Sequence, residues 1–341
     1  MPTPVPTDSR PSLADVAQAS GTSVPTVSRV LNGRTKNFSV RSDLRDRIVE
    51  TASRLGYRPN INARTLRSQS TGYVAVLGLR MLARAIHDPS DSVIDLMAAR
   101  LAEAGLHLTT TFVHGDENAY ELPPWQVDGA VVVRSTRPED FAAVEAANLP
   151  YVSINSPAGP SGVSVVVDDA GAMRQLLDHL HGLGHRRIAY ATPPRAGVRH
   201  VSETDRQQAY EAWMRAAGRP TLVLDDGTPD SMMRPLDRAL SAGVTAVIAY
   251  DHFMAANLVA AAAQRGVAVP GRLSIAAFND EYPTSHLWPT VTTVGHPKQR
   301  LADEATRRLL GAVREGRRAE RVCLPMTLSV RQSTGPPPAD P

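Results

Sequence analysis

Residues 12–33 carry the pattern of two short helices joined by a tight turn, and this pattern limits the possible folds more than any other segment. Ser12 followed by Asp15 matches a capping box, which begins a helix by satisfying its free backbone amides. Gly21 then permits a sharp turn, because glycine adopts backbone angles that other residues avoid. Helix pairs of this kind occur in many folds, so the pattern alone leaves the function open.

The second helix is predicted over residues 24–31, with Ser23 as its N-cap and Asn32-Gly33 at its end. Its outward side chains are small, so such a helix could enter the major groove of DNA. The candidate contacts on this helix are Ser23, Val24, Pro25, Thr26, Ser28, Arg29 and Asn32.

Apolar residues recur at helical spacing between Leu44 and Leu55 and predict a third helix, which Pro59 is expected to end. Three helices can enclose a small core. The polar segment 60–68 contains one large apolar residue, Leu66, and is too short to form a stable helix alone. It could become helical on a surface that orders it.

Positive charge is concentrated in this part of the chain. Residues 10–70 contain eleven Lys and Arg against four Asp and Glu, a net charge of +7. The whole chain carries +3, so the remaining residues sum to −4. A basic patch can be a solvated surface and nothing more, but here it coincides with the helical pair and could supply phosphate contacts to DNA.

Three segments together resemble the LacI/GalR family of bacterial transcriptional regulators: DVAQASGTSVPTVSRVLNG, LGYRPN and NARTLRS. In that family, a hinge helix after the headpiece folds in the minor groove of the operator. The resemblance implies that Leu66 wedges between base pairs at the dimer axis, with the small Ala63 beside it. It also implies that Tyr57 and Asn60 lie near the DNA backbone. Unstacking a base step costs roughly a few kcal/mol, and the bent DNA offers more surface for contact in return.

The same resemblance makes Val24 and Pro25 the positions that discriminate most between DNA sequences. Neither side chain can hydrogen-bond a base edge, so both are limited to apolar contacts such as one with a thymine methyl group. We therefore expect Arg29 to be the main polar reader. The loop after this helix, GRTKNFSV, is longer than is usual in the family, and Lys36 and Asn37 in it could add backbone contacts.

With 341 residues, the chain is long enough for this headpiece and a large body with its own core. Residues 1–11, which include four prolines, and residues 335–341 are predicted to be flexible tails. Cys323 is the only cysteine, which excludes an internal disulfide and agrees with a reducing cytoplasm. The sequence has neither a long apolar run nor a signal peptide, so we expect a cytoplasmic protein with no membrane contact.

From Tyr73 onward, apolar strands alternate with amphipathic helices, a pattern typical of parallel sheets with crossover helices. The resemblance extends over this body and implies two Rossmann-like subdomains of periplasmic-binding-protein type, between which the chain crosses three times. The first is expected to hold 71–164 and a helix near 297–318, and the second 165–293 and a terminal strand. The expected fold is thus α/β, with these parts: a three-helix helix-turn-helix headpiece at 12–59, a hinge helix and linker at 60–70, and an effector-binding and dimerisation body at 71–334.

Ligands of such folds bind beyond the carboxyl ends of the strands, a place held here by Leu79, Ser135, Asn155, Tyr250 and Asn279. The resemblance implies that Arg206 binds polar groups of the effector. Asn155 and Asn279 stand where the family usually has aspartates that accept hydrogen bonds from sugar hydroxyls, so this pocket is less acidic. Tyr250 replaces a usual asparagine and could stack on a ligand. A surface ion pair for Arg206 and turns for the asparagines are the structural alternatives.

Two other clusters could suggest reactive sites. His179, His181 and His185 lie close in sequence, but glycines interrupt the helix between the last two, so capping and solvation explain them better than a metal does. Asp168 and Asp169 point apart at a strand end, and a helix N-cap explains one of them. We therefore expect no metal, no cofactor and no catalytic residue.

The sequence predicts a repressor that binds a pseudopalindromic operator in double-stranded DNA as a homodimer and responds to a small sugar or sugar-like effector. Effector binding would change the angle between the subdomains and thus the spacing of the two hinges, which requires different effector affinities in the two states. A solute-binding protein with the same body would need an export signal and no basic headpiece. An enzyme on a similar scaffold would need a set of catalytic side chains, and the sequence shows no such set.

We expect Leu66→Ala to weaken operator binding while leaving effector binding unchanged, because the substitution removes the wedge and leaves the body intact. Titration of a labelled operator duplex with both proteins tests this expectation. Equal operator affinities for the variant and the parent would contradict the wedge assignment.

Overall fold

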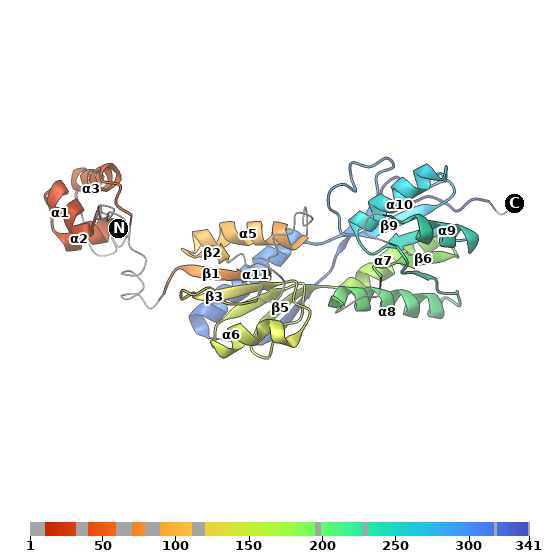
Figure 1. The fold of residues 1–341 in the computed structure, drawn as a ribbon, viewed down its shortest axis with the longest axis horizontal. Helices are drawn as coiled ribbons and strands as arrows, with labels where there is room; N and C mark the ends of the chain where they lie inside the picture. Colours follow the sequence, from red (N-terminus) through yellow and green to blue (C-terminus); the bar gives the residue numbers. More distant parts are fainter. Residues whose placement is uncertain are drawn as a thin grey trace, which may run out of the picture. The chain divides into compact units, whose positions relative to one another are not determined.

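The structure is a computed structural model, and it divides into two compact units, Met1–Thr71 and Gly72–Pro341 (Figure 1). The residues that it describes are 11–31, 40–58, 70–78, 89–110, 120–194, 199–227, 231–316 and 319–339. No helix within these ranges is both long enough and apolar enough to cross a membrane.

Among its described residues, the first unit contains three helices: α1 (Leu13–Ser20), α2 (Val24–Leu31) and α3 (Ser42–Arg54). Ser12 and Asp15 form the predicted capping box at the start of α1, and Gly21 closes that helix at φ 63°. All three helices pack against one another around a small core whose fully buried members are Val16, Val27 and Ile48. The apolar residues at helical spacing therefore face this core, as the periodicity indicates.

The third helix ends earlier than Pro59, the residue expected to end it. Its last residue is Arg54, and Gly56 follows at φ 66°. Gly56 adopts the left-handed conformation that commonly terminates a helix, so the glycine ends this helix before the proline can.

The second unit is built on two six-stranded sheets. The first sheet is entirely parallel and has the strand order β11-β5-β4-β3-β1-β2. Its strands are β1 (Tyr73–Leu77), β2 (His107–Thr110), β3 (Gly129–Val133), β4 (Tyr151–Ile154), β5 (Val163–Val167) and β11 (Glu320–Leu324). The helices of this subdomain are α5 (Pro89–Glu103), a 3₁₀ helix η1 (Pro138–Phe141), α6 (Ala142–Ala146) and α11 (Lys298–Glu315).

The second sheet has the order β12-β10-β9-β8-β6-β7 and is parallel except for the pair β10 and β12. Its strands are β6 (Ile188–Ala191), β7 (Val223–Leu224), β8 (Ala246–Ala249), β9 (Ser274–Phe278), β10 (Thr292–Gly295) and β12 (Thr327–Ser329). The helices of this subdomain are α7 (Asp169–Gly182), α8 (Val201–Ala216), α9 (Met233–Ser241) and α10 (His252–Gln264).

Helices cover both faces of each sheet, and the alternation of side chains along the strands explains how. Val74 and Val76 of β1 pack in the core that α5 and α11 contribute to, whereas Ala75 and Leu77 pack in the one that contains Phe141 and Val144. Figure 1 shows α6 across the first sheet from α5. Because both faces are covered, the strands are rich in continuous apolar residues, such as the buried GAVVV of β3.

The chain crosses between the two sheets three times: from β5 to α7, from β10 to α11, and from β11 to β12. Two details differ from the sequence-based division. The first sheet extends to Val167, so the expected boundary at 164/165 falls inside β5. The first sheet also includes β11, whose edge position against β5 depends on pairing between segments more than a hundred residues apart.

The prediction of a flexible tail over 335–341 is wrong for its first residue. The amide of Gly335 donates to Ser274 Oγ, and its carbonyl oxygen lies 2.9 Å from Nε2 of the buried His185. Because a carbonyl oxygen only accepts hydrogen bonds, Nε2 carries the proton, and Nδ1 accepts from the Thr245 hydroxyl at 2.9 Å. His185 thus holds the end of the chain to the second sheet as a neutral imidazole.

His185 is expected to make the body less stable as the pH falls below about 6.5. Burial lowers its pKa, and the hydrogen bond to Gly335 only partly opposes this. The unfolded chain then binds a proton near the ordinary histidine pKa that the folded chain does not bind, so stability is lost as the pH falls. Urea unfolding at a series of pH values should show a shallower dependence for His185→Gln than for the parent. The same slope in both proteins would contradict this role.

Candidate functional site

The second helix of the first unit presents a small exposed surface. Ser23, Val24, Pro25 and Arg29 are exposed, with 41% of Val24 accessible, while Val27 and Val30 face the core. Ser23 Oγ accepts from the Thr26 amide at 3.4 Å and lies 2.9 Å from Thr26 Oγ1, so it caps α2 as expected. The exposed surface therefore offers two apolar side chains, a capping hydroxyl and one guanidinium.

The other residues expected to contact DNA are either less exposed than these or lie outside the described residues. Thr26 and Ser28 are half-buried on α2. Tyr57 is also half-buried and packs against the three-helix core, with its amide donating to the Ala52 carbonyl oxygen at 2.9 Å. The remaining candidates lie outside the described residues: Asn32, Lys36, Asn37, Asn60, Ala63 and Leu66.

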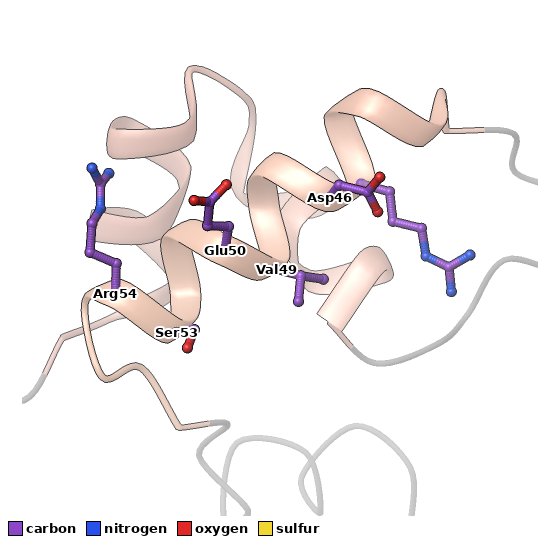
Figure 2. A pocket seen from close by; sticks show the side chains of 6 residues that line it. Asp46, Val49, Glu50, Ser53 and Arg54 are labelled. Carbon is purple, nitrogen blue, oxygen red and sulfur yellow. The ribbon is translucent and has the colours of Figure 1, made fainter.

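A shallow hollow lies along the exposed face of α3 (Figure 2). Its lining residues are Arg45, Asp46, Val49, Glu50, Ser53 and Arg54. Two cations and two carboxylates balance there, so this face has no excess positive charge with which to attract phosphate. The hollow is a mixed-charge, solvent-exposed face of α3.

In the body, the candidate effector residues stand at the carboxyl ends of strands. Asn155 follows β4 and Asn279 follows β9, both in the left-handed conformation at φ 52° and 68°. Asparagine tolerates this conformation better than most residues, and the turn that it permits ends each strand. Ser135 follows β3 and Tyr250 follows β8, while Leu79 lies outside the described residues.

Arg206 connects the candidate effector residue Tyr250 to its neighbours through hydrogen bonds and ring contacts. Its side chain is only 3% exposed, and Nε donates to Asp169 Oδ1 at 2.6 Å. Nη1 donates to the Tyr250 carbonyl oxygen at 2.7 Å, and the guanidinium carbon lies 4.0 Å from the Phe278 ring centroid and 4.8 Å from that of Tyr250. Nη2 donates to no residue that the structure describes.

The charge of Arg206 is compensated inside the protein. Burial by itself lowers the pKa of the guanidinium, but the Asp169 carboxylate, together with Tyr250 and Tyr190, outweighs burial, and the net pKa is raised. Arg206 thus remains a cation, and it forms a neutral pair with Asp169. The surface-ion-pair alternative is wrong for this residue, because neither partner is exposed.

Tyr250 is oriented by a chain of hydrogen bonds. Its hydroxyl lies 2.9 Å from Ser202 Oγ, which lies 2.8 Å from His200 Nδ1. Because that nitrogen also accepts from the Ser202 amide, the Ser202 hydroxyl donates to it and accepts from Tyr250. Burial raises the pKa of the Tyr250 hydroxyl, which keeps it protonated.

Two buried polar atoms in the site have no hydrogen-bond partner among the residues that the structure describes: Ser135 Oγ and Asn279 Oδ1. Buried polar atoms without partners are costly, and a ligand that bonds to them removes that cost. The side-chain amide nitrogen of Asn155 makes one long contact, 3.5 Å to His296 Nε2 in the segment that joins β10 to α11. The site therefore combines amide, hydroxyl and imidazole groups with a neutralised guanidinium.

Sequence reasoning did not identify several of these partners. Of the Asp168-Asp169 pair, Asp168 caps α7 by accepting from the Gly171 amide at 2.7 Å, as expected for one of them, and Asp169 holds Arg206. His200 and Ser202 had no signal beyond their place at the start of α8. The structure brings Arg206 and Tyr250 into contact, whereas no described contact joins Ser135 to either.

The histidines near the end of α7 have structural partners. His179 Nε2 lies 3.0 Å from Thr334 Oγ1, and the ring of His181 lies against Trp213 at 5.4 Å. Within the described ranges, no group of three or more His, Cys, Asp or Glu side chains could hold a metal ion. The polar groups described at these strand ends are suited to binding a ligand through hydrogen bonds.

Comparison with known proteins agrees with both units. Residues 12–60 match the family described as bacterial regulatory proteins of the lacI family, and residues 177–334 match a periplasmic binding protein-like domain. The transcriptional regulator CelR of Thermobifida fusca is 31% identical, over 95% of this chain and 98% of the relative. The regulator GalS of Salmonella typhimurium is 30% identical, over 86% and 87%.

Solved structures share the fold. A Lac repressor dimer bound to operator and the anti-inducer ONPF has a TM-score of 0.78 at 22% identity, covering 96% of this chain and 100% of that one. A CelR–cellobiose complex has a TM-score of 0.66 at 26% identity, covering 95% and 100%. The expected headpiece and two-subdomain body are thereby confirmed, and the chain belongs to the lacI family of bacterial regulatory proteins.

Proposed function

We propose that this protein is a cytoplasmic repressor that binds a pseudopalindromic operator in double-stranded DNA as a homodimer and responds to a sugar or sugar-like effector. The observation that carries the proposal is the presence, in one chain, of an exposed second helix in a basic headpiece and of strand-end residues with unsatisfied polar atoms in the body. The regulators and the operator-bound dimer that the chain resembles support this combination.

At the DNA, α2 enters the major groove of each half-site. Val24 and Pro25 make apolar contacts, and Arg29 bonds to a guanine or a phosphate. Leu66 of each copy inserts at the centre, where the dimer axis lies. The proposed DNA-contacting residues are Ser23, Val24, Pro25, Thr26, Ser28, Arg29, Asn32, Tyr57, Asn60, Ala63 and Leu66.

In the body, the proposed effector contacts are Ser135, Asn155, Arg206, Tyr250 and Asn279. Arg206 offers Nη2, and Ser135 and Asn279 offer buried atoms that lack partners among the described residues. The cellobiose complex of the related CelR makes cellobiose the first sugar to test, followed by other neutral mono- and disaccharides.

Exposed aromatic side chains on the second subdomain support a homodimer. Trp288 is 83% exposed and Tyr282 is 56% exposed. Large apolar side chains that project this far into water favour burial against another surface. A symmetric pairing of two copies would also match the two-fold symmetry of the proposed operator.

Selection of bound duplexes from random DNA tests the DNA function. We expect an enriched sequence with two inverted half-sites, because each copy of a dimer reads one of them. If Arg29 bonds to a guanine, Arg29→Ala loses preference at one base pair in each half-site, at a cost of about 1–3 kcal/mol. If it bonds to a phosphate, the variant binds all sequences more weakly and keeps its preference. Arg265→Ala on the body should leave the selected sequence unchanged. A failure to enrich any sequence would contradict the proposal.

We expect Arg206→Ala to abolish the effect of the effector on operator binding while leaving the apo protein's operator affinity within a small factor of the parent's. The substitution removes a ligand donor and leaves Asp169 buried without its cation, so thermal unfolding must be measured alongside. Fluorescence titration of the selected duplex, with and without sugar, gives both affinities. An unchanged sugar response in the variant would show that Arg206 is not an effector contact.

A further inference from the structure

One ion pair joins the two subdomains next to the effector cleft. Glu281 follows β9 in the second subdomain, and Lys298 is the first residue of α11, which packs on α5 and the first sheet. Lys298 Nζ lies 2.5 Å from Glu281 Oε1 and 2.7 Å from Oε2. The glutamate side chain is 7% exposed and the lysine side chain 28%, so the pair is largely shielded from water.

The segment that carries Glu281 also carries an effector residue. Asn279 stands two positions earlier, and Asp280 between them is bound by Arg331, whose Nη2 lies 2.7 Å from Asp280 Oδ1. Thr284 Oγ1 donates to the Glu281 carbonyl oxygen at 2.7 Å, which closes a turn behind the segment. Arg331 therefore holds the segment from the second subdomain, and Lys298 holds it from the first.

The segment that joins β10 to α11 and carries Lys298 also contacts a candidate effector residue. His296 precedes Lys298 by two residues, and its Nε2 lies 3.5 Å from the amide of Asn155 at the end of β4. A ligand that binds Asn155 and Asn279 would thus touch residues on both sides of the Glu281–Lys298 contact. A shift of either residue changes the geometry of that contact.

We propose that Glu281 and Lys298 are positioning residues that set the angle between the subdomains and the place of Asn279 in the cleft. The inference rests on the proposed function only in taking Asn279 as an effector contact. Loss of Lys298 removes the positive charge that Glu281 faces from the first subdomain, and it therefore weakens the contact that holds the 279–281 segment to that subdomain. The two subdomains then lose their preferred orientation.

Spin labels at Ala147→Cys in the first subdomain and Gln264→Cys in the second, in a Cys323→Ser background, test this proposal. Both label sites are exposed. Pulsed dipolar spectroscopy on the full chain, with neither DNA nor sugar added, gives the distribution of label distances. We expect Lys298→Met to broaden or shift this distribution relative to the parent, and Lys298→Arg, which keeps the charge, to match the parent.

Two further variants separate this role from a general loss of stability. The swap Glu281→Lys with Lys298→Glu should restore the parent distribution. Arg265→Met breaks an exposed ion pair with Asp237 inside the second subdomain, and it should change nothing. An unchanged distribution for Lys298→Met, the same broadening in Arg265→Met, or no recovery in the swap would overturn the proposal. The spin-label measurement uses neither ligand nor DNA, so a negative result there would leave the proposed function standing. Conversely, a failure to select an operator would leave the proposed role of Glu281 and Lys298 untouched.

Discussion

The buried pair of Arg206 and Asp169 is the interaction on which the proposed effector site depends. Asp169 begins α7 directly after the chain leaves the first sheet, and Arg206 lies one turn and a half into α8. Removal of one partner from a pair this buried costs about 3–5 kcal/mol, because the other charge is left without compensation. The same guanidinium fixes the backbone of Tyr250 and packs on Phe278, so it connects the ends of β8 and β9 to the crossover helix.

This arrangement favours recognition over reaction. The cation and carboxylate at its centre neutralise each other, and the surrounding groups are amides, hydroxyls and aromatic rings. Such groups supply directional hydrogen bonds, which a polyhydroxylated ligand can match. Binding alone can regulate DNA only if the ligand prefers one orientation of the subdomains. The contact of Asn155 with His296, and the Glu281–Lys298 ion pair two residues beyond Asn279, provide a physical basis for that preference.

The sequence was most informative where structure depends on neighbouring residues. The capping box of Ser12 and Asp15, the turn at Gly21 and the bounds of α2 follow from local chemistry, and the apolar runs of β3, β5 and β9 follow from burial on both faces. The family resemblance supplied the two-subdomain body. Within the cleft, it led to Arg206, Tyr250 and the two asparagines as candidates, and their positions at strand ends follow from the parallel topology.

What could not be predicted depends on contacts between distant segments. Nothing in the sequence pairs Asp169 with Arg206, or His185 with Gly335, because these partners are 37 and 150 residues apart. The proline-rich end of the chain has the composition of a flexible tail, yet Gly335 is held by a histidine that lies 150 residues earlier in the chain. Similarly, β11 joins the first sheet through a pairing that no local periodicity reveals.

In the proposed function, sugar binding in the body and operator binding by the headpiece are coupled. The most direct test is to measure how each ligand changes the affinity of the protein for the other. The affinity of the protein for its best-binding sugar is determined by calorimetry with and without saturating operator duplex, and the operator affinity is determined with and without that sugar. If the cleft and the headpiece are coupled in one molecule, the two ratios are equal and differ from one. A sugar affinity that operator DNA leaves unchanged would contradict the coupling, even if each ligand binds tightly by itself.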